Sequence, residues 1–129
     1  MRPLPRLLLA AVALSAACAK ADTGELGHSD PRRPIVAAAG TEFQLVLKSN
    51  PSTGYAWILA DSLPPGVLAL VGSRYEPDRR SAGRDGGGGR ERWTFRALGP
   101  GEAAIPLVYA RPWERNDPAD SARFQVTVR

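Results

Sequence analysis

Residues 90–98, Arg-Glu-Arg-Trp-Thr-Phe-Arg-Ala-Leu, alternate between polar and apolar side chains along most of their length. Positions 93, 95 and 97 are apolar, whereas positions 92, 94 and 96 are polar. Successive side chains of an extended chain point to opposite faces, so this period of two predicts a β-strand with one face in a core. We therefore expect Trp93 to be buried, and the same reasoning applies to Trp57, which also lies in a strand-like pattern.

Strand-like patterns recur on both sides of this stretch. Five further strands are expected, at residues 41–48, 55–60, 67–75, 102–110 and 122–128. Gly72 suggests a bulge in the third of these stretches, and Pro106, which has no N–H to donate, suggests a sheet edge or bulge in the fourth. Six or seven short strands separated by turn signals are typical of an all-β, immunoglobulin-like β-sandwich, whose binding loops cluster at one end.

Length and composition restrict the function further. The chain has 129 residues, enough for one domain and too few for a second sizeable core. A single cysteine, Cys18, excludes an intramolecular disulfide framework and a multi-cysteine metal site. A single histidine, His28, cannot form a multi-histidine metal site and makes a His-dependent catalytic triad hard to build. We therefore expect no enzyme activity, no catalytic residues, no cofactor and no bound metal.

Residues 1–18 have the pattern of an export signal. Arg2 and Arg6 precede an unbroken apolar run at Leu7–Leu14, which is far shorter than the ~20 residues that span a bilayer. Small residues follow and lead to Cys18, as in the lipobox of bacterial lipoproteins, where the cysteine is acylated. The other interpretation is plain secretion with cleavage after position 17, 19 or 21. Both predict an extracytoplasmic protein, either periplasmic, anchored to a bacterial membrane as a lipoprotein, or secreted.

The mature chain is only weakly charged. The full sequence has 17 basic and 13 acidic residues, and removal of the signal with its two arginines leaves 15 against 13. So small an excess gives no reason to expect nucleic acid as a partner, and contact with a membrane is expected only through a lipid anchor. Residues 19–34 are polar and without periodicity, so we expect a flexible tether in which His28 is solvated. The domain itself is then residues 35–129.

Two of the predicted connections between strands have unusual compositions. Asn50-Pro51-Ser52-Thr53-Gly54-Tyr55 combines a proline, which fixes φ, with a glycine, which permits a positive φ. It predicts a stiff, narrow turn that is either an ordinary hairpin connection or a presented binding loop. The run Gly86-Gly87-Gly88-Gly89 does not continue into a phosphate-binding motif. It is either a loose loop or exposed backbone available to a partner.

The third unusual connection is Arg111-Pro112-Trp113-Glu114, directly after a predicted strand. Trp113 leaves the alternating pattern and stands among charges, so we expect an exposed side chain. An exposed tryptophan beside an arginine has the composition of a binding hot spot. The alternative is a tryptophan folded back over the end of the sandwich.

The three loops, in this order and on this strand pattern, resemble the chagasin family of cysteine peptidase inhibitors. The resemblance rests on Asn-Pro-Ser-Thr-Gly-Tyr at 50–55, the glycine run before Trp-Thr-Phe at 93–95, and Ala-Arg-Pro-Trp-Glu at 110–114. It implies an immunoglobulin-like fold and reversible, non-covalent inhibition of papain-like cysteine peptidases by a monomer. It also implies three contacts: a wedge at 50–55 with Thr53 nearest the catalytic centre, backbone contacts at 86–89, and a grip by Arg111, Pro112 and Trp113.

A second functional hypothesis comes from the exposed aromatic residues alone. Trp113 and Tyr55 have the ring surfaces on which a sugar can stack, so an extracytoplasmic carbohydrate- or protein-binding sandwich module is the alternative. Retention on glycans would favour that module, and inhibition of a peptidase would count against it.

Overall fold

The computed structural model describes residues 27–78 and 88–129. The predicted export signal with Cys18, the first part of the predicted tether, and Gly86 and Gly87 of the glycine run lie outside the described residues. Among the residues that are described, no helix is long and apolar enough to cross a membrane.

The described residues form seven strands and one short 3₁₀ turn. The strands are β1 (Ile35–Ala37), β2 (Glu42–Ser49), β3 (Ala56–Leu59), β4 (Leu68–Pro77), β5 (Gly89–Ala97), β6 (Gly101–Ala110) and β7 (Asp120–Val128), and the 3₁₀ turn is η1 (Pro51–Thr53). Each of the six strands predicted from the sequence is present, with ends shifted by at most two residues. Strand β1 was not predicted because three residues are too few for a readable alternation.

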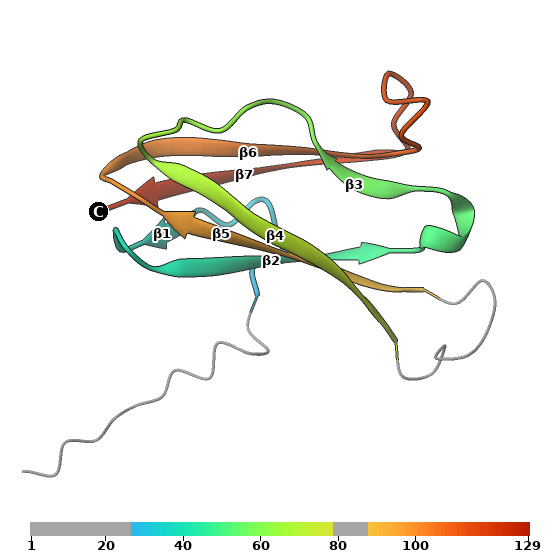
Figure 1. Ribbon diagram of the computed structural model, residues 1–129, viewed down its shortest axis with the longest axis horizontal. Helices are drawn as coiled ribbons and strands as arrows, with labels where there is room; N and C mark the ends of the chain where they lie inside the picture. Colours follow the sequence, from blue (N-terminus) through green and yellow to red (C-terminus); the bar gives the residue numbers. More distant parts are fainter. Residues whose placement is uncertain (1–26, 79–87) are drawn as a thin grey trace, which may run out of the picture.

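The strands form two facing sheets (Figure 1). One sheet has the order β1-β7-β6-β3 and the other has the order β2-β5-β4. Strand β1 runs parallel to β7, and every other pairing is antiparallel. This arrangement confirms the predicted immunoglobulin-like β-sandwich.

The core lies between the two sheets, where the apolar positions of the alternating strands meet. Its fully buried side chains come from both sheets and include Phe95, Phe124, Leu45 and Ile105. Trp57 and Trp93 are 8% and 6% exposed, which confirms their predicted burial. The core therefore fixes the two sheets against each other and provides a rigid base for the loops at each end.

Both local irregularities predicted from the sequence are present. The register between β4 and β5 shifts between Leu70 and Gly72, as the predicted bulge requires. Strand β6 lies between β7 and β3 and keeps its register with β7, but its pairing with β3 covers only Leu107–Ala110. Pro106 therefore lies at a local edge on the β3-facing side of β6, as the proline predicted. The carbonyl of Pro106 accepts a hydrogen bond from the Ala60 N–H at 2.8 Å, just past the end of β3, so the missing N–H falls where that ladder stops.

The chain is already attached to the sandwich at residue 28. The His28 N–H donates to the Gln44 carbonyl at 2.8 Å, and the His28 carbonyl accepts from the Val46 N–H at 2.9 Å. Gly27 lies so close to the Val46 side chain that a β-carbon there would overlap with it. Residues 27 and 28 therefore cover the free edge of β2, although they belong to the segment 19–34 that was expected to be a tether.

Candidate functional site

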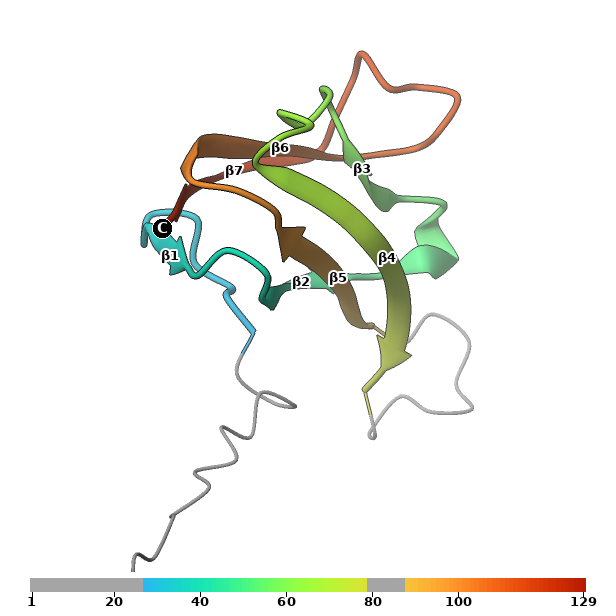
Figure 2. The ribbon, with the colours of Figure 1, turned by 60° about the vertical axis from the view of Figure 1, so that its left-hand side comes forward.

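Three connections meet at one end of the sandwich, opposite the end that holds the C-terminus. Figures 1 and 2 both place there the turn η1, the β6–β7 connection, and the ends of β4 and β5 that lead into residues 79–87. These are the connections that contain the three motifs singled out in the sequence. We call the β2–β3 connection, Asn50–Tyr55, the Asn50 loop, and the β6–β7 connection, residues 111–119, the Trp113 loop.

The Asn50 loop is closed by its own hydrogen bonds. The Asn50 carbonyl accepts from the Thr53 N–H at 3.2 Å and from the Thr53 hydroxyl at 2.7 Å, and the Gly54 N–H donates to the Pro51 carbonyl at 3.0 Å. The Ser52 hydroxyl donates to Asn50 Oδ1 at 2.6 Å. Gly54 has a φ of 82°, a left-handed conformation in which only glycine is free of strain. The loop is therefore the stiff, narrow turn that its sequence predicted.

The base of the Asn50 loop is fastened to the opposite sheet. The Asn50 N–H donates to the Tyr109 hydroxyl of β6 at 2.8 Å, and the Trp57 indole of β3 donates to the Lys48 carbonyl at 2.9 Å. The rings of Tyr55 and Tyr109 stack with centroids 5.4 Å apart, and Trp57 lies against Tyr109 at 5.1 Å. These contacts join both ends of the loop to the core.

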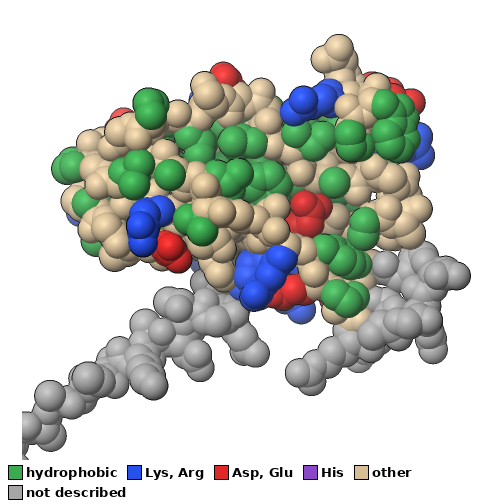
Figure 3. Space-filling model, in the orientation of Figure 1, with side chains coloured by type: hydrophobic (Ala, Val, Ile, Leu, Met, Phe, Trp, Pro, Cys, Tyr) green, Lys and Arg blue, Asp and Glu red, His purple; other side chains and the backbone are tan. Residues whose placement is uncertain are grey.

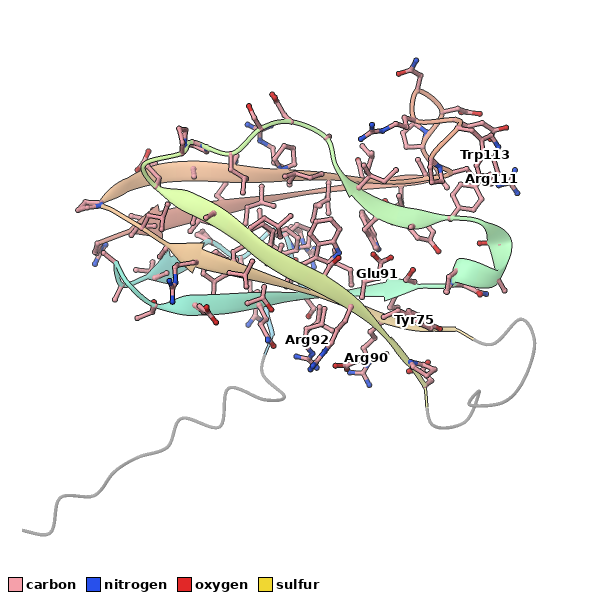
Figure 4. All side chains as sticks on the ribbon, viewed as in Figure 1. Tyr75, Arg90, Glu91, Arg92, Arg111 and Trp113 are labelled. Atoms are coloured by element: carbon pink, nitrogen blue, oxygen red, sulfur yellow. The ribbon has the colours of Figure 1, made fainter. Side chains whose placement is uncertain are left out.

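Glu91 supplies one more link between the sheets behind the Asn50 loop. One carboxylate oxygen accepts from the Trp57 N–H at 3.0 Å, and the other accepts from the Trp93 indole at 3.3 Å. Glu91 is only 9% exposed, and in Figure 4 it lies between β5 and β3. A buried carboxylate with two N–H donors fixes the position of β3, and with it the chain that leaves the Asn50 loop.

The Trp113 loop lies directly against the Asn50 loop. A β-carbon on Gly54 would be 3.3 Å from the Trp113 ring edge, at Cη2, and 3.6 Å from Arg111 Nε. Arg111 Nε donates to the Thr53 carbonyl at 3.2 Å, and its guanidinium carbon stands 4.7 Å from the centre of the Tyr55 ring. Figure 4 shows Arg111 and Trp113 together beside this turn. The two loops thus form one continuous surface.

Trp113 is the most exposed of the large apolar side chains in the described residues, at 71%. The prediction of an exposed tryptophan is therefore confirmed, and the alternative of a ring folded back over the core is wrong. The turn that carries it is closed by the Glu114 N–H, which donates to the Arg111 carbonyl at 2.9 Å. Arg111 Nη1 and Glu114 Oε2 are 3.8 Å apart, so the charges flanking the ring offset each other. Figure 3 shows apolar and basic side chains together on this corner of the molecule.

The two described glycines of the glycine run differ in their surroundings. Gly89 is buried in β5 between Ser49 of β2 and Pro77 of β4. A β-carbon there would overlap with the Glu76 carbonyl oxygen and lie 2.7 Å from Tyr75 Cζ. At Gly88 the nearest atom to an added β-carbon is the Ser49 carbonyl oxygen, at 3.8 Å. The fold therefore requires glycine at 89, whereas nothing described within the chain requires it at 88.

An ion-pair network holds the outer face of β4 and β5 near this end. Arg92 Nε donates to Glu76 Oε1 at 3.1 Å, and Arg92 Nη1 donates to Gln44 Oε1 at 3.0 Å. These bonds explain why Arg92 is 7% exposed although its position in the alternation directs it outward. The hydrogen bond from Arg92 lowers the pKa of Glu76; burial opposes this shift, and the charges of Arg92 and Arg74 add to it.

The structure brings together the predicted site residues that it describes, namely Asn50, Pro51, Ser52, Thr53, Gly54, Tyr55, Gly88, Gly89, Arg111, Pro112 and Trp113. Sequence reasoning missed the supporting residues Glu91 and Tyr109. For Glu91 the sequence held a signal. In the alternating pattern it falls on the same face as Trp93 and Phe95, so the pattern itself directs its carboxylate into the core.

Comparison with known proteins decides the family. The sequence model described as chagasin family peptidase inhibitor I42 matches residues 36–128. This chain belongs to the chagasin family. Amoebiasin-1 of Entamoeba histolytica is 37% identical over 94 residues, which cover 73% of this chain and 86% of that protein. The resemblance inferred from the three loops is thereby confirmed, and the family is one of peptidase inhibitors rather than enzymes.

Solved structures agree with this assignment to the chagasin family. A cysteine protease inhibitor from Entamoeba histolytica superposes with a TM-score of 0.63 at 27% identity, covering 74% of this chain and 86% of that one. PbICP-C, solved in complex with falcipain-2, superposes with a TM-score of 0.57 at 18% identity, covering 81% of this chain and 96% of that one. The second likeness bears on the fold alone, and both support the immunoglobulin-like sandwich described above.

Proposed function

We propose that this chain inhibits papain-like cysteine peptidases reversibly and without covalent chemistry, by placing the Asn50 loop in the active-site groove. Gly88 and the Trp113 loop would contact the groove on either side of that loop. The observation that best supports this proposal is that the Asn50 and Trp113 loops form one surface. Arg111 bonds to the Asn50 loop, Gly54 lies next to Trp113, and Trp113 is exposed. Membership of a family of peptidase inhibitors supports the same function.

The geometry of the Asn50 loop suits a groove between two lobes. Its tip, residues 51–53, is exposed and narrow, and four internal hydrogen bonds hold it closed. A peptidase cleaves a substrate in an extended conformation, so this turn would first have to lose those bonds. The loop can therefore occupy the groove while its peptide bonds stay out of the geometry needed for attack.

Rigidity also favours affinity. Each flexible side chain that becomes ordered on binding costs roughly 0.5–1.5 kcal/mol. Arg111 is already placed over Tyr55 and bonded to Thr53, and Tyr55 is already stacked on Tyr109. Little of this surface has to be ordered when a partner arrives. Three loops at one end can supply the ~800 Å² per partner of a standard interface.

The test is a titration of papain-like and unrelated peptidases with the purified chain and with a Trp113→Ala variant. The unaltered chain should inhibit papain-like enzymes and leave serine peptidases active. Trp113→Ala should raise the inhibition constant about thirtyfold, the effect of losing ~2 kcal/mol at an interface tryptophan. Its melting temperature should stay within a few degrees, because a side chain that is 71% exposed contributes little to folding.

Leu98→Ala is the matched control for this titration. Leu98 is 42% exposed and lies in the β5–β6 connection, at the other end of the sandwich. It should change neither inhibition nor, by more than a few degrees, the melting temperature. Full activity of several papain-like enzymes at micromolar inhibitor would contradict the proposal. Equal inhibition by the parent and Trp113→Ala would show that the Trp113 side chain is not part of the interface.

We further propose that the mature chain acts outside the cytoplasm, as a periplasmic or secreted protein or as a lipoprotein anchored through Cys18. The basic start, the short apolar run and the small residues before Cys18 support export. Mass spectrometry of the mature N-terminus distinguishes the forms. An acylated Cys18 establishes the anchor, an N-terminus at Lys20 or Asp22 establishes plain secretion, and an intact residue 1 contradicts both.

A further inference from the structure

Tyr75 is an inward-facing aromatic residue that the core does not cover. It lies opposite Glu91 in the β4–β5 register, and the preceding inward position of β4, Ser73, lies opposite Trp93. On β5 this face is buried, with Glu91 9% and Trp93 6% exposed. Tyr75 nevertheless remains 36% exposed. Strand β4 therefore carries its ring past the region that the second sheet covers.

The hydroxyl end of the Tyr75 ring lies against the backbone of Gly89. A β-carbon on Gly89 would come 2.7 Å from Tyr75 Cζ and 2.5 Å from its hydroxyl oxygen, so the ring occupies the space that a side chain there would fill. On its other side Gly89 pairs with Ser49, the residue before the Asn50 loop. Tyr75 is thus one strand away from the base of that loop and is ordered before any partner binds.

Tyr75 and Trp113 flank the Asn50 loop from opposite sides. In the view of Figure 4, Trp113 lies above the turn and Tyr75 lies below it, on β4. Both are exposed, at 36% and 71%, and both are of the residue types most enriched in binding hot spots. A tyrosine presents a large surface with few rotatable bonds, so its contact costs little conformational entropy.

We infer that Tyr75 is a further contact residue of the inhibitor, an aromatic shelf for the groove wall opposite the one that Trp113 contacts. This inference rests on the proposed function. The partner surface that fits it is a strip of backbone and apolar side chains along the rim of the peptidase groove. The exposed part of the ring would be buried there while its hydroxyl end stays against Gly89.

Three variants test the inference: Tyr75→Ala, Tyr75→Phe and Val71→Ala. Tyr75→Ala should raise the inhibition constant about tenfold, whereas Tyr75→Phe, which keeps the ring, should stay within about twofold of the parent. Val71 is 56% exposed on the same strand, at the bulge and away from this end, so Val71→Ala should also stay within about twofold. Melting temperatures of all three report any general loss of structure.

Nitration of Tyr75, read from the mass of its peptide, separates contact from mere support of Gly89. A shelf covered by the peptidase should be nitrated in the free chain and protected in the complex. Unchanged inhibition by Tyr75→Ala, equal losses in Tyr75→Ala and Tyr75→Phe, or full nitration in the complex would each overturn the inference while leaving the proposed function intact. A parent chain that inhibits no papain-like peptidase would overturn both.

Discussion

A methyl group added to Gly89 should destabilise the domain. Gly89 is buried, and its β-carbon would overlap with the Glu76 carbonyl oxygen and crowd the Tyr75 ring. A backbone oxygen cannot move aside without disturbing the β4–β5 pairing at Pro77 and Gly89. Overpacking of this kind costs about 1–3 kcal/mol. For a domain of this size, each kcal/mol lowers the melting temperature by roughly 4–8 °C, so Gly89→Ala should melt roughly 4–24 °C below the parent.

The same methyl group at Gly88 should not destabilise the fold and should weaken inhibition. The nearest atom would be the Ser49 carbonyl oxygen at 3.8 Å, an ordinary contact, and Gly88 is not among the glycines with positive φ. Replacing such a glycine often stabilises a protein by about 0.4–1 kcal/mol through the unfolded chain. If the backbone at 88 touches the peptidase, the methyl group separates the two surfaces. A loss of ~1.4 kcal/mol would raise the inhibition constant tenfold.

Thermal unfolding and peptidase titration, run on both variants, check these expectations. Gly88→Ala should melt no lower than the parent and should have a raised inhibition constant. Gly89→Ala should melt below the parent. If Gly88→Ala inhibits as well as the parent, its backbone is not in the interface. If Gly89→Ala melts with the parent, the close packing of Tyr75 on Gly89 is not what fixes this end of β4 and β5.

Three other substitutions follow from single observations. Gly54→Ala should lower the free energy of unfolding by about 1–2 kcal/mol, because residue 54 has a φ of 82°. It should also raise the inhibition constant, because the added β-carbon would lie 3.3 Å from the Trp113 ring. An unchanged melting temperature together with an unchanged inhibition constant would contradict the loop geometry. Ser49→Ala should leave the free energy of unfolding in denaturant unchanged or raise it by up to about 1 kcal/mol. The buried Ser49 hydroxyl has no hydrogen-bond partner among residues 27–78 and 88–129, so its removal breaks no bond there. A clear loss of stability would reveal a partner. Glu76→Gln should lower the free energy of unfolding near neutral pH, and this difference from the parent should shrink as the pH falls. The reason is that a carboxyl group with a lowered pKa stabilises the fold at pH values above its ordinary pKa of 4.5 and loses that effect as it is protonated. Unfolding free energies that differ equally at every pH would exclude this role for the Glu76–Arg92 pair.

Alternation and loop chemistry made much of this molecule readable from its sequence. Period-two patterns predicted six strands because each has one face in the core, and Trp57 and Trp93 followed from the same parity. Pro51 and Gly54 predicted the stiff turn because each restricts or permits a particular φ. Trp113 was predicted to be exposed because it breaks the alternation and stands beside charges. In each case a local property of the chain decides the outcome.

Features that depend on pairing between distant strands were not readable in this way. Pro106 predicted an edge or a bulge, but only the pairing shows that β6 is an interior strand whose ladder with β3 ends just before Pro106. Strand β1 is defined by its parallel partner β7 rather than by its own three residues. The docking of His28 on β2 requires knowing that the edge of β2 is free. Such facts belong to the topology and have no signature within one short segment.

The supporting residues show why the loops of this inhibitor depend on the sandwich beneath them. Arg111 stands over Tyr55, Tyr55 stacks on Tyr109, and Tyr109 packs against the core residue Trp57. Each member of this series is fixed by the next, so movement of the Asn50 loop would have to disturb the core. A substrate yields to a peptidase because its chain can extend in the groove. This turn resists extension because its internal hydrogen bonds and its aromatic support would have to be lost together. Under the proposed function, the cost of that combined loss would keep the Asn50 loop from being cleaved as a substrate, although its peptide bonds are ordinary.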